Sequence, residues 1–548
     1  MSNNRPFRFT PLIIAISLVA GILIGAFYSN RSTGTKLGII NSSSNKINAL
    51  LRIIESQYVD SVNMADLVEK AVPQLLSELD PHSTYIPAQD METANAELEG
   101  SFSGIGIQFN IQDDTVHVNS VIHGGPSEKV GLMAGDRIIS VDDTSFVGKH
   151  ITPQYAPRKL KGPKGSQVKL GILRPGEKET LTFVIERGDI PVKSVDAAYM
   201  IDPQIGYIKI NKFGRTTYME MLVAIAQLRN HSSQGLIIDL RGNTGGYMDA
   251  AIKMVSEFLS PNELIVYTEG RQYPREEYYS IPMGSCEETP LVVLIDEGSA
   301  SASEIFAGAI QDNDRGTLIG RRSFGKGLVQ QSIDFSDGSA IRLTVARYYT
   351  PSGRCIQKPY DLGENDVYEM DILNRYEHGE FFSEDSIQQD TLQVYHTALG
   401  RTVYGGGGIM PDIFVPQDTT DVTTYYSLVA NRGLPIQFAY QYTDQHRKQL
   451  SAYTEIQTLQ EYLQKQGTLE QFIRYAEGKG IKRRNLQIQR SRQLLERSVF
   501  GNIIYNMLGF EAYIQYANQT DPTVEKALQV LREGESWPVT PTPTATTE

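Results

Sequence analysis

The sequence predicts a multi-domain α/β protein, in which a small β-rich domain precedes an α/β core and helical segments flank both. The chain has 548 residues, more than one ordinary hydrophobic core accommodates. Short alternating apolar stretches with glycine turns give way to longer apolar runs that alternate with helical patterns. A hydrophobic content of 40% and a charged content of 21% are those of a globular protein.

The first segment, residues 1–35, is predicted to be a membrane anchor and stalk. Residues 11–28 carry no charge, and 18 helical residues at about 1.5 Å each span roughly 27 Å, enough for a bilayer core. A cleaved signal peptide is the alternative, but Ser29-Asn30-Arg31 offers no small-residue cleavage site. No other long apolar run occurs, so we expect a single span with the rest of the chain on one side.

Residues 36–100 are predicted to be helical and residues 101–188 to form the β-rich domain. Apolar residues recur at helical spacing between residues 46 and 80, and Asp80-Pro81 ends the second helix. From residue 104 the apolar residues alternate with small or polar ones, between glycine-containing turns, as in short half-buried strands.

Residues 189–420 are predicted to form the α/β core. Uniformly apolar runs suit strands covered on both faces, and their alternation with helices implies a largely parallel sheet. The expected strands are Ile205–Ile210, Gly235–Leu240 and Leu291–Ile295, and the expected helices are Met219–Leu228, Met248–Phe258 and one from Ser303. Residues 421–535 are predicted to be helical, and the Pro/Thr-rich residues 536–548 to be a disordered tail.

Composition excludes several classes of function. The formal net charge of −13 argues against a nucleic-acid binder, which needs a basic face. Neither cysteine, Cys286 or Cys355, lies in a Cys-x-x-Cys pair, so a zinc site or a redox motif has no support. The two cysteines could form one disulfide or remain two unpaired thiols.

The stretch from Asp296 to Ile305, DEGSASASEI, follows a buried strand and opens a helix. Ser301 would lie where the strand gives way to the helix, with free backbone N–H groups beside its hydroxyl. A nucleophile fits this location, and so does an ordinary helix N-cap.

Lys326 lies between two glycines and among apolar neighbours in the stretch RRSFGKGLVQQ. Desolvation there would lower the pKa of the ammonium from about 10.4, and a neutral lysine can act as a general base. The alternative is a surface lysine in a glycine turn. The phosphate-binding Gly-Lys-Ser/Thr pattern is absent.

Two consecutive glycines, Gly245 and Gly246, end the stretch LRGNTGG after a buried strand. Their N–H groups suit an oxyanion hole, although a connection that needs positive φ would also use glycine. None of the eight histidines falls in the three glycine-rich stretches, and Gly-x-Ser-x-Gly is missing, so lysine is the better-placed base.

Six stretches together resemble the C-terminal processing peptidases, also called tail-specific proteases, over residues 46–415. They are FSGIGIQF (102–109), GGPSEKVGLMAGDRIISVDD (124–143), LIIDLRGNTGG (236–246), GSASASEIFAGAIQD (298–312), GRRSFGKGLVQ (320–330) and GRTVYGGGGIMPDI (400–413). The resemblance implies a serine endopeptidase that needs no cofactor and forms an acyl-enzyme.

The resemblance also assigns roles to residues. Ser301 is implied to be the nucleophile and Lys326 the general base, while Gln330 positions the lysine from four residues away, a spacing that suits one helical face. The backbone N–H of Ala302 and of one of the two glycines, Gly245 or Gly246, would form the oxyanion hole; the sequence does not say which glycine, and Gly245 is favoured.

The β-rich domain resembles a PDZ domain, which binds an extended peptide by strand addition and captures its terminal carboxylate. The implied loop is Ser103-Gly104-Ile105-Gly106-Ile107. The implied partners are the C-terminal tails of substrate proteins, the membrane, and a second copy or an adaptor bound through the terminal helices. The implied location is the bacterial inner membrane, with the soluble part in the periplasm. A non-catalytic membrane-anchored PDZ scaffold and an acyl-CoA hydratase-like enzyme are the competing interpretations.

Overall fold

The computed structural model describes Val19 and residues 43–112, 114–231, 233–282, 284–388 and 391–535. The chain divides into two compact units, residues 1–74 and residues 75–548. The first unit contains α2 (Ser43–Gln57) and most of α3 (Met64–Ser77). The predicted anchor, apart from Val19, and the predicted tail lie outside the described residues. Among the helices that are described, none is both long and apolar enough to cross a membrane.

The second unit is built around a six-stranded sheet, in the order β10-β11-β12-β15-β16-β21. Only β10 and β11 pair antiparallel, and every other neighbouring pair is parallel. The strands are β10 (Val195–Asp202), β11 (Ile205–Ile210), β12 (Gly235–Asp239), β15 (Leu291–Ile295), β16 (Thr317–Gly320) and β21 (Ile413–Phe414). The predicted largely parallel sheet is confirmed, with each predicted strand within one residue of its observed bounds.

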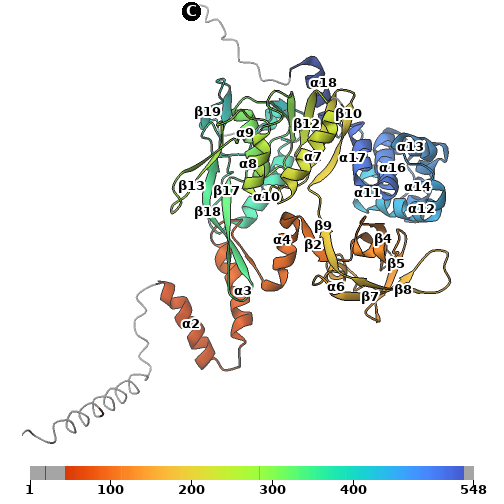
Figure 1. The fold of residues 1–548 in the computed structure, drawn as a ribbon, viewed down its shortest axis with the longest axis horizontal. Coiled ribbons are helices and arrows are strands. Elements are labelled where there is room, and N and C mark those ends of the chain that lie inside the picture. Colours follow the sequence, from red (N-terminus) through yellow and green to blue (C-terminus); the bar gives the residue numbers. More distant parts are fainter. Residues whose placement is uncertain are drawn as a thin grey trace, which may run out of the picture. The chain divides into compact units, whose positions relative to one another are not determined.

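Helices cover both faces of this sheet. Alternate residues of β12 divide between two cores, because Leu236 and Ile238 pack on one side and Ile237 on the other. The first core also contains residues of α7 (Thr217–Asn230), α8 (Met248–Ser256) and α9 (Ala302–Asp312). The second contains Ile514 of α17 (Phe510–Asn518) and three residues of α18 (Pro522–Glu533). Figure 1 shows α7, α8 and α9 beside β12.

A second sheet carries the strands that follow the lysine loop. Its order is β1-β18-β13-β14, and β17 pairs antiparallel with β18. The strands are β1 (Thr84–Ile86), β13 (Leu264–Glu269), β14 (Glu276–Tyr279), β17 (Leu328–Asp334) and β18 (Ala340–Tyr349). The other elements of this part of the chain are α4 (Met91–Glu99), α10 (Asn365–Glu377), the pair β19 (Val394–His396) and β20 (Thr402–Tyr404), and two short 3-10 turns, η1 (Ala88–Asp90) and η2 (Glu384–Ser386).

The β-rich domain has a core of its own, with Val116, Ile138 and Leu170 fully buried. Its sheet runs in the order β3-β4-β5-β7-β8, with β6 on β5, so β3 is an edge strand. The elements are β3 (Ile107–Gln112), β4 (Thr115–Val121), α5 (Pro126–Lys129), β5 (Arg137–Val141), β6 (Thr144–Ser145), α6 (Tyr155–Leu160), β7 (Gln167–Leu173) and β8 (Leu181–Glu186). The separate pair β2 (Ser101–Gly104) and β9 (Gly188–Pro191) flanks this sheet in sequence.

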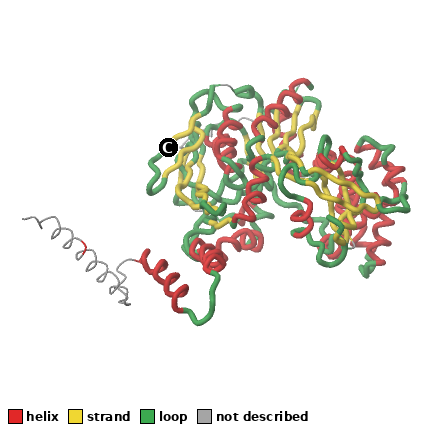
Figure 2. Tube along the Cα trace, turned by 60° about the horizontal axis from the view of Figure 1, so that its bottom comes forward, coloured by secondary structure: helices red, strands yellow, loops and turns green. Residues whose placement is uncertain are grey.

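The C-terminal helices contribute to two cores, and α17 contributes to both, through Tyr516 and Ile514. One set shares a helical core that includes Leu459, Phe472 and Val499. It comprises α11 (Thr424–Asn431), α12 (Leu434–Leu450), α13 (Ile456–Lys465), α14 (Thr468–Gly478), α15 (Asn485–Arg490) and α16 (Arg492–Leu508). Figure 2 shows these regions by element type, with strands in yellow and helices in red. The sequence predicts one helical region over 421–535, whereas α18 packs on the central sheet.

Candidate active site

The turn that carries Ser301 joins the end of β15 to the start of α9. Ser301 has φ 56° and ψ −115°, a conformation that L-residues rarely adopt and that costs on the order of 1–3 kcal/mol. Neighbouring contacts hold the turn: Ser299 Oγ donates to Leu240 O at 2.8 Å, and Gly298 N–H donates to Asp296 Oδ1 at 3.0 Å. Such strain persists only where the surroundings impose it, as is common at reactive side chains.

The glycine loop after β12 lies directly against this turn. A Cβ on Gly245 would stand 2.8 Å from Ser301 Cβ and 2.7 Å from Ala300 O, and one on Gly246 would stand 2.2 Å from Phe213 O. Both glycines also have positive φ, 100° and 145°. Only glycine therefore allows the loop to approach the nucleophile turn this closely.

Asn243 is fully buried, and its hydrogen bonds hold the glycine loop in place. Its side chain donates to Ile210 O at 3.0 Å, and its carbonyl accepts from Ala300 N–H and Ser303 Oγ. Its Oδ1 accepts from Gly245 N–H at 2.9 Å. The glycine N–H that the sequence favours as an oxyanion donor is thus already engaged in this structure.

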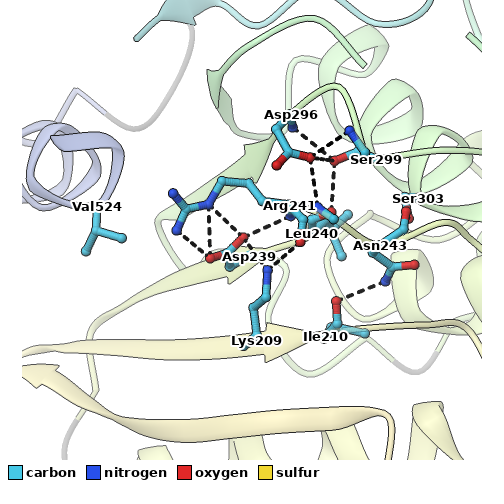
Figure 3. Close-up of polar contacts among 12 residues, drawn as sticks. Lys209, Ile210, Asp239, Leu240, Arg241, Asn243, Asp296, Ser299, Ser303 and Val524 are labelled. Atoms are coloured by element: carbon cyan, nitrogen blue, oxygen red, sulfur yellow. Dashed lines mark hydrogen bonds and ion pairs between the residues drawn. The ribbon is translucent and has the colours of Figure 1, made fainter. Parts of the chain in front are cut away.

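A buried ionic network lies beneath the loop, as Figure 3 shows. Asp239, 1% exposed, is bonded by Arg241 at 2.7 Å and by Lys209 at 3.1 Å, and Tyr207 donates its hydroxyl to the same carboxylate at 2.6 Å. Burial raises the pKa of Asp239, but the charges of Arg241 and Lys209 outweigh burial and hold that pKa well below its ordinary value. Arg241 also bonds Asp521, at the start of α18.

Lys326 lies in the loop between β16 and β17. Burial lowers its pKa; the Glu304 carboxylate opposes that shift, and Arg342 reinforces it. A lowered pKa is what a lysine needs to act as a base near neutral pH. In this structure the Lys326 side chain is half-buried.

One cavity of about 320 Å³ contains both Ser301 and Lys326 in its wall. Its other lining residues are Asn95, Leu98, Thr244, Gly246, Tyr247, Met248, Ile305, Leu328, Val329, Gln330, Ser332, Arg342 and Tyr348. No histidine of the described chain lines it; His82, whose pKa burial lowers to about 4, bonds the Tyr368 hydroxyl at 2.9 Å instead.

The prediction that Gln330 shares a helical face with Lys326 is wrong. Gln330 lies in strand β17, directly after a register shift that follows Val329. Its Nε2 donates to Thr344 Oγ1 at 3.4 Å, and Thr344 in turn donates to Asp80 Oδ1 at 2.9 Å. The spacing was misleading because a glycine-flanked loop runs into a strand here.

Two residues that were not predicted from the sequence contact the backbones of both Ser301 and Lys326. Glu304, fully buried, accepts hydrogen bonds from the N–H groups of both, each at 2.8 Å. Tyr348 shares its one hydroxyl proton between the carbonyls of both. The Ser-x-x-Glu pattern at Ser301 matches a helix capping box, and this signal could have identified Glu304.

The predicted peptide-binding residues divide between two elements. Ser103 and Gly104 belong to β2, while Ile105 and Gly106 form the turn into β3, which begins at Ile107. Gly106 has φ 77°, and its carbonyl accepts from Ile122 N–H at 3.0 Å.

Both cysteines are free thiols, Cys286 buried and Cys355 half-buried. Within the described ranges, no cluster of three or more His, Cys, Asp or Glu side chains could hold a metal ion.

Three family models match the chain. Residues 103–185 match the PDZ domain, residues 204–363 match peptidase family S41, and residues 425–509 match a family of unknown function, DUF8443.

Individual proteins agree with these matches. The carboxy-terminal processing protease CtpB of Bacillus subtilis is 35% identical over 58% of this chain and 66% of its own length, just under two thirds. A carboxy-terminal-processing protease of Bartonella bacilliformis is 38% identical over 56% of this chain and 70% of its own. A solved photosystem II D1 C-terminal processing protease is 29% identical, covers 59% of this chain and 91% of its own, and superposes with a TM-score of 0.33.

The PDZ and peptidase matches occur in the order of the two observed domains, and the Bartonella relative is matched over more than two thirds of its length. The chain is therefore a serine-type peptidase of family S41 and belongs to the PDZ-containing carboxy-terminal processing proteases.

Proposed function

We propose that this chain is an endopeptidase in which Ser301 is the nucleophile and Lys326 the general base. The observation that carries the proposal is the shared cavity, in which a strained serine and a half-buried lysine with a lowered pKa lie in one wall. A lysine that is partly neutral near pH 7 can accept a hydroxyl proton, which is the requirement for a serine–lysine pair.

The reaction follows from these two groups. Ser301 Oγ attacks the peptide carbonyl carbon while its proton passes to Lys326 Nζ. The tetrahedral intermediate collapses, the C–N bond breaks, and Lys326 returns the proton to the leaving amine. The remaining ester on Ser301 is then hydrolysed by a water molecule that Lys326 deprotonates. The products are two shorter chains and the free enzyme.

The oxyanion donors proposed are the N–H of Ala302 and one N–H from the Gly245-Gly246 pair. Ala302 is the first residue of α9, where backbone N–H groups lack partners within the helix. Gly245 N–H is bonded to Asn243, so Gly246 is the better candidate in this arrangement. Gln330 would support Lys326 only after exchanging its Thr344 contact for the lysine amine.

The β-rich domain is proposed to capture the C-terminal tail of the substrate. Within the described residues β3 pairs only with β4, so its other edge is open to an added peptide strand. The turn at Ile105 and Gly106 directly precedes that edge and suits a terminal carboxylate. A non-catalytic PDZ scaffold is the competing function, and the half-buried lysine that lines the same cavity as Ser301 argues against it.

The location is also a proposal: a single-span anchor in a bacterial inner membrane, with the peptidase in the periplasm. The uncharged residues 11–28 support it. Alkaline carbonate extraction of membranes tests the anchor, because release of the chain into the soluble fraction would contradict it. Binding of a second copy or an adaptor through the helical segments stays a prediction.

The test of the activity uses the full chain in mild detergent and an unstructured polypeptide with an apolar C-terminus, in free-carboxylate and amidated forms. We expect the free form to be cleaved faster and both Ser301→Ala and Lys326→Ala to be inactive. Cleavage that persists in Ser301→Ala would refute the proposed nucleophile, and equal cleavage of both forms would refute tail capture.

A further inference from the structure

We propose that Glu304 and Tyr348 form a clamp that fixes the backbone of Ser301 relative to the backbone of Lys326. The inference rests on the proposed serine–lysine mechanism and adds two positioning residues to it. Neither side chain is proposed to touch the reacting atoms.

The carboxylate of Glu304 forms one half of the clamp. Its Oε2 accepts the N–H of Ser301 and the N–H of Lys326, both at 2.8 Å. Its Oε1 accepts Gly325 N–H at 2.7 Å and Ser323 Oγ at 2.5 Å. Four donors from two segments that lie some twenty residues apart therefore converge on one buried carboxylate.

The hydroxyl of Tyr348 forms the other half. It contacts Ser301 O at 3.1 Å and, more closely, Lys326 O. Burial raises the pKa of Tyr348 well above its usual value, so the hydroxyl keeps its proton and stays a donor. The same two side chains thus hold the N–H and the carbonyl of both residues.

This arrangement has a direct chemical use. Ser301 is held in a strained conformation, and the glycines beside Lys326 make its loop intrinsically flexible. Proton transfer between the two side chains requires a fixed separation, which neither the turn nor the loop supplies alone. Only residues that contact both segments can impose it.

Glu304 also acts on Lys326 electrostatically. Burial raises the pKa of Glu304 to about 7, and its carboxylate raises the pKa of Lys326. The titratable groups that interact electrostatically with Glu304 or Lys326 are His82, Asp80, Arg342, Tyr348, Lys358 and Tyr368. Removal of the Glu304 charge should therefore lower the pKa of Lys326.

The test compares Glu304→Gln and Tyr348→Phe with two matched controls in the full chain. Asp312→Asn also removes a buried carboxylate from α9, and Tyr349→Phe removes the neighbouring hydroxyl of β18. Each variant is assayed for kcat, KM, affinity of the β-rich domain for a free-carboxylate peptide, and the rate at which a fluorophosphonate labels Ser301.

We expect each clamp variant to lose kcat and labelling rate by on the order of 100-fold, with KM and peptide affinity unchanged. The double variant should lose less than the product of the two single losses, because both side chains hold the same pair of residues. In Glu304→Gln the acid limb of the kcat profile should also move to lower pH, a shift that a purely structural defect would not produce.

Clamp variants that keep the kcat and labelling rate of their matched controls would overturn the clamp while the serine–lysine mechanism stands. An unlabelled wild type, or a labelled Ser301→Ala, would instead overturn the mechanism and the clamp with it. Equal losses in Asp312→Asn and Glu304→Gln would reduce the role of Glu304 to general stability and overturn its positioning role.

Discussion

Substitution of Gly245 by alanine tests the close approach between the glycine loop and the nucleophile turn. The new Cβ would meet Ser301 Cβ at 2.8 Å, Ala300 O at 2.7 Å and Ala302 N at 2.9 Å, so backbone or nucleophile must move. A matched control exists in the same loop, because Gly242 also has positive φ, 69°, and a Cβ there would meet nothing within 4 Å.

The two variants separate conformational strain from contact. An alanine at positive φ costs about 1–2 kcal/mol, which both variants share. Crowding in a well-packed site adds about 1–3 kcal/mol in Gly245→Ala alone. For a domain of this size the additional cost of crowding lowers the Tm of Gly245→Ala by roughly 2–12 °C relative to the Tm of Gly242→Ala.

Activity should separate the two variants further. In Gly245→Ala we expect Ser301 to move by up to about 1 Å, which should lower kcat by on the order of 100-fold. In Gly242→Ala we expect kcat to be retained. Peptide cleavage and differential scanning calorimetry on the full chain measure both quantities. Equal kcat and equal Tm in the two variants would refute the argument that the loop must be glycine to reach the nucleophile.

Three further predictions address the lysine, the buried network and the peptide site. Lys326→Arg should abolish cleavage up to pH 9 although it keeps the positive charge, because a guanidinium cannot lose its proton there; measurable turnover would refute the assignment of the base. Asp239→Asn should destabilise the fold by about 3–5 kcal/mol in urea, since Arg241 and Lys209 lose their buried partner. Because the pKa of Asp239 is depressed in the folded state, its stabilisation is present above about pH 3.9 and is lost as pH falls, so the difference between wild type and variant should shrink in acid. Gly106→Ala, at φ 77° and 3.0 Å from Ile190 Cδ1, should weaken binding of a free-carboxylate peptide without changing fluorophosphonate labelling; unchanged binding in fluorescence anisotropy would argue against a role for this turn.

The sequence predicted the central sheet well because its strands are buried on both faces. Runs such as Leu291–Ile295 carry no polar residue, and few other environments tolerate them. The turn at Ser301 was equally visible, since the end of a buried strand followed by small residues leaves little choice of geometry. Local composition is therefore enough to predict both the buried strands and the turn.

Features that depend on distant packing were not predictable. The apolar face of α18 shows in its sequence, but nothing there says that Val524, Ala527 and Val530 pack against the central sheet rather than against the other C-terminal helices. Gln330 likewise depends on a register shift in β17, set by the pairing with β18. The periodicity of apolar residues shows which residues share one face of a helix or strand. It does not show which other element packs against that face.

The position of α18 has a consequence for synthesis. Ser301 and Lys326 emerge from the ribosome long before residues 522–533, which cover the second face of the central sheet and bring Asp521 to Arg241. Until then the face of the central sheet that α18 covers is incomplete, and Arg241 has Asp239 but not Asp521 as an ion-pair partner. A nascent chain therefore contains Ser301 and Lys326 before α18 can complete the packing of the central sheet.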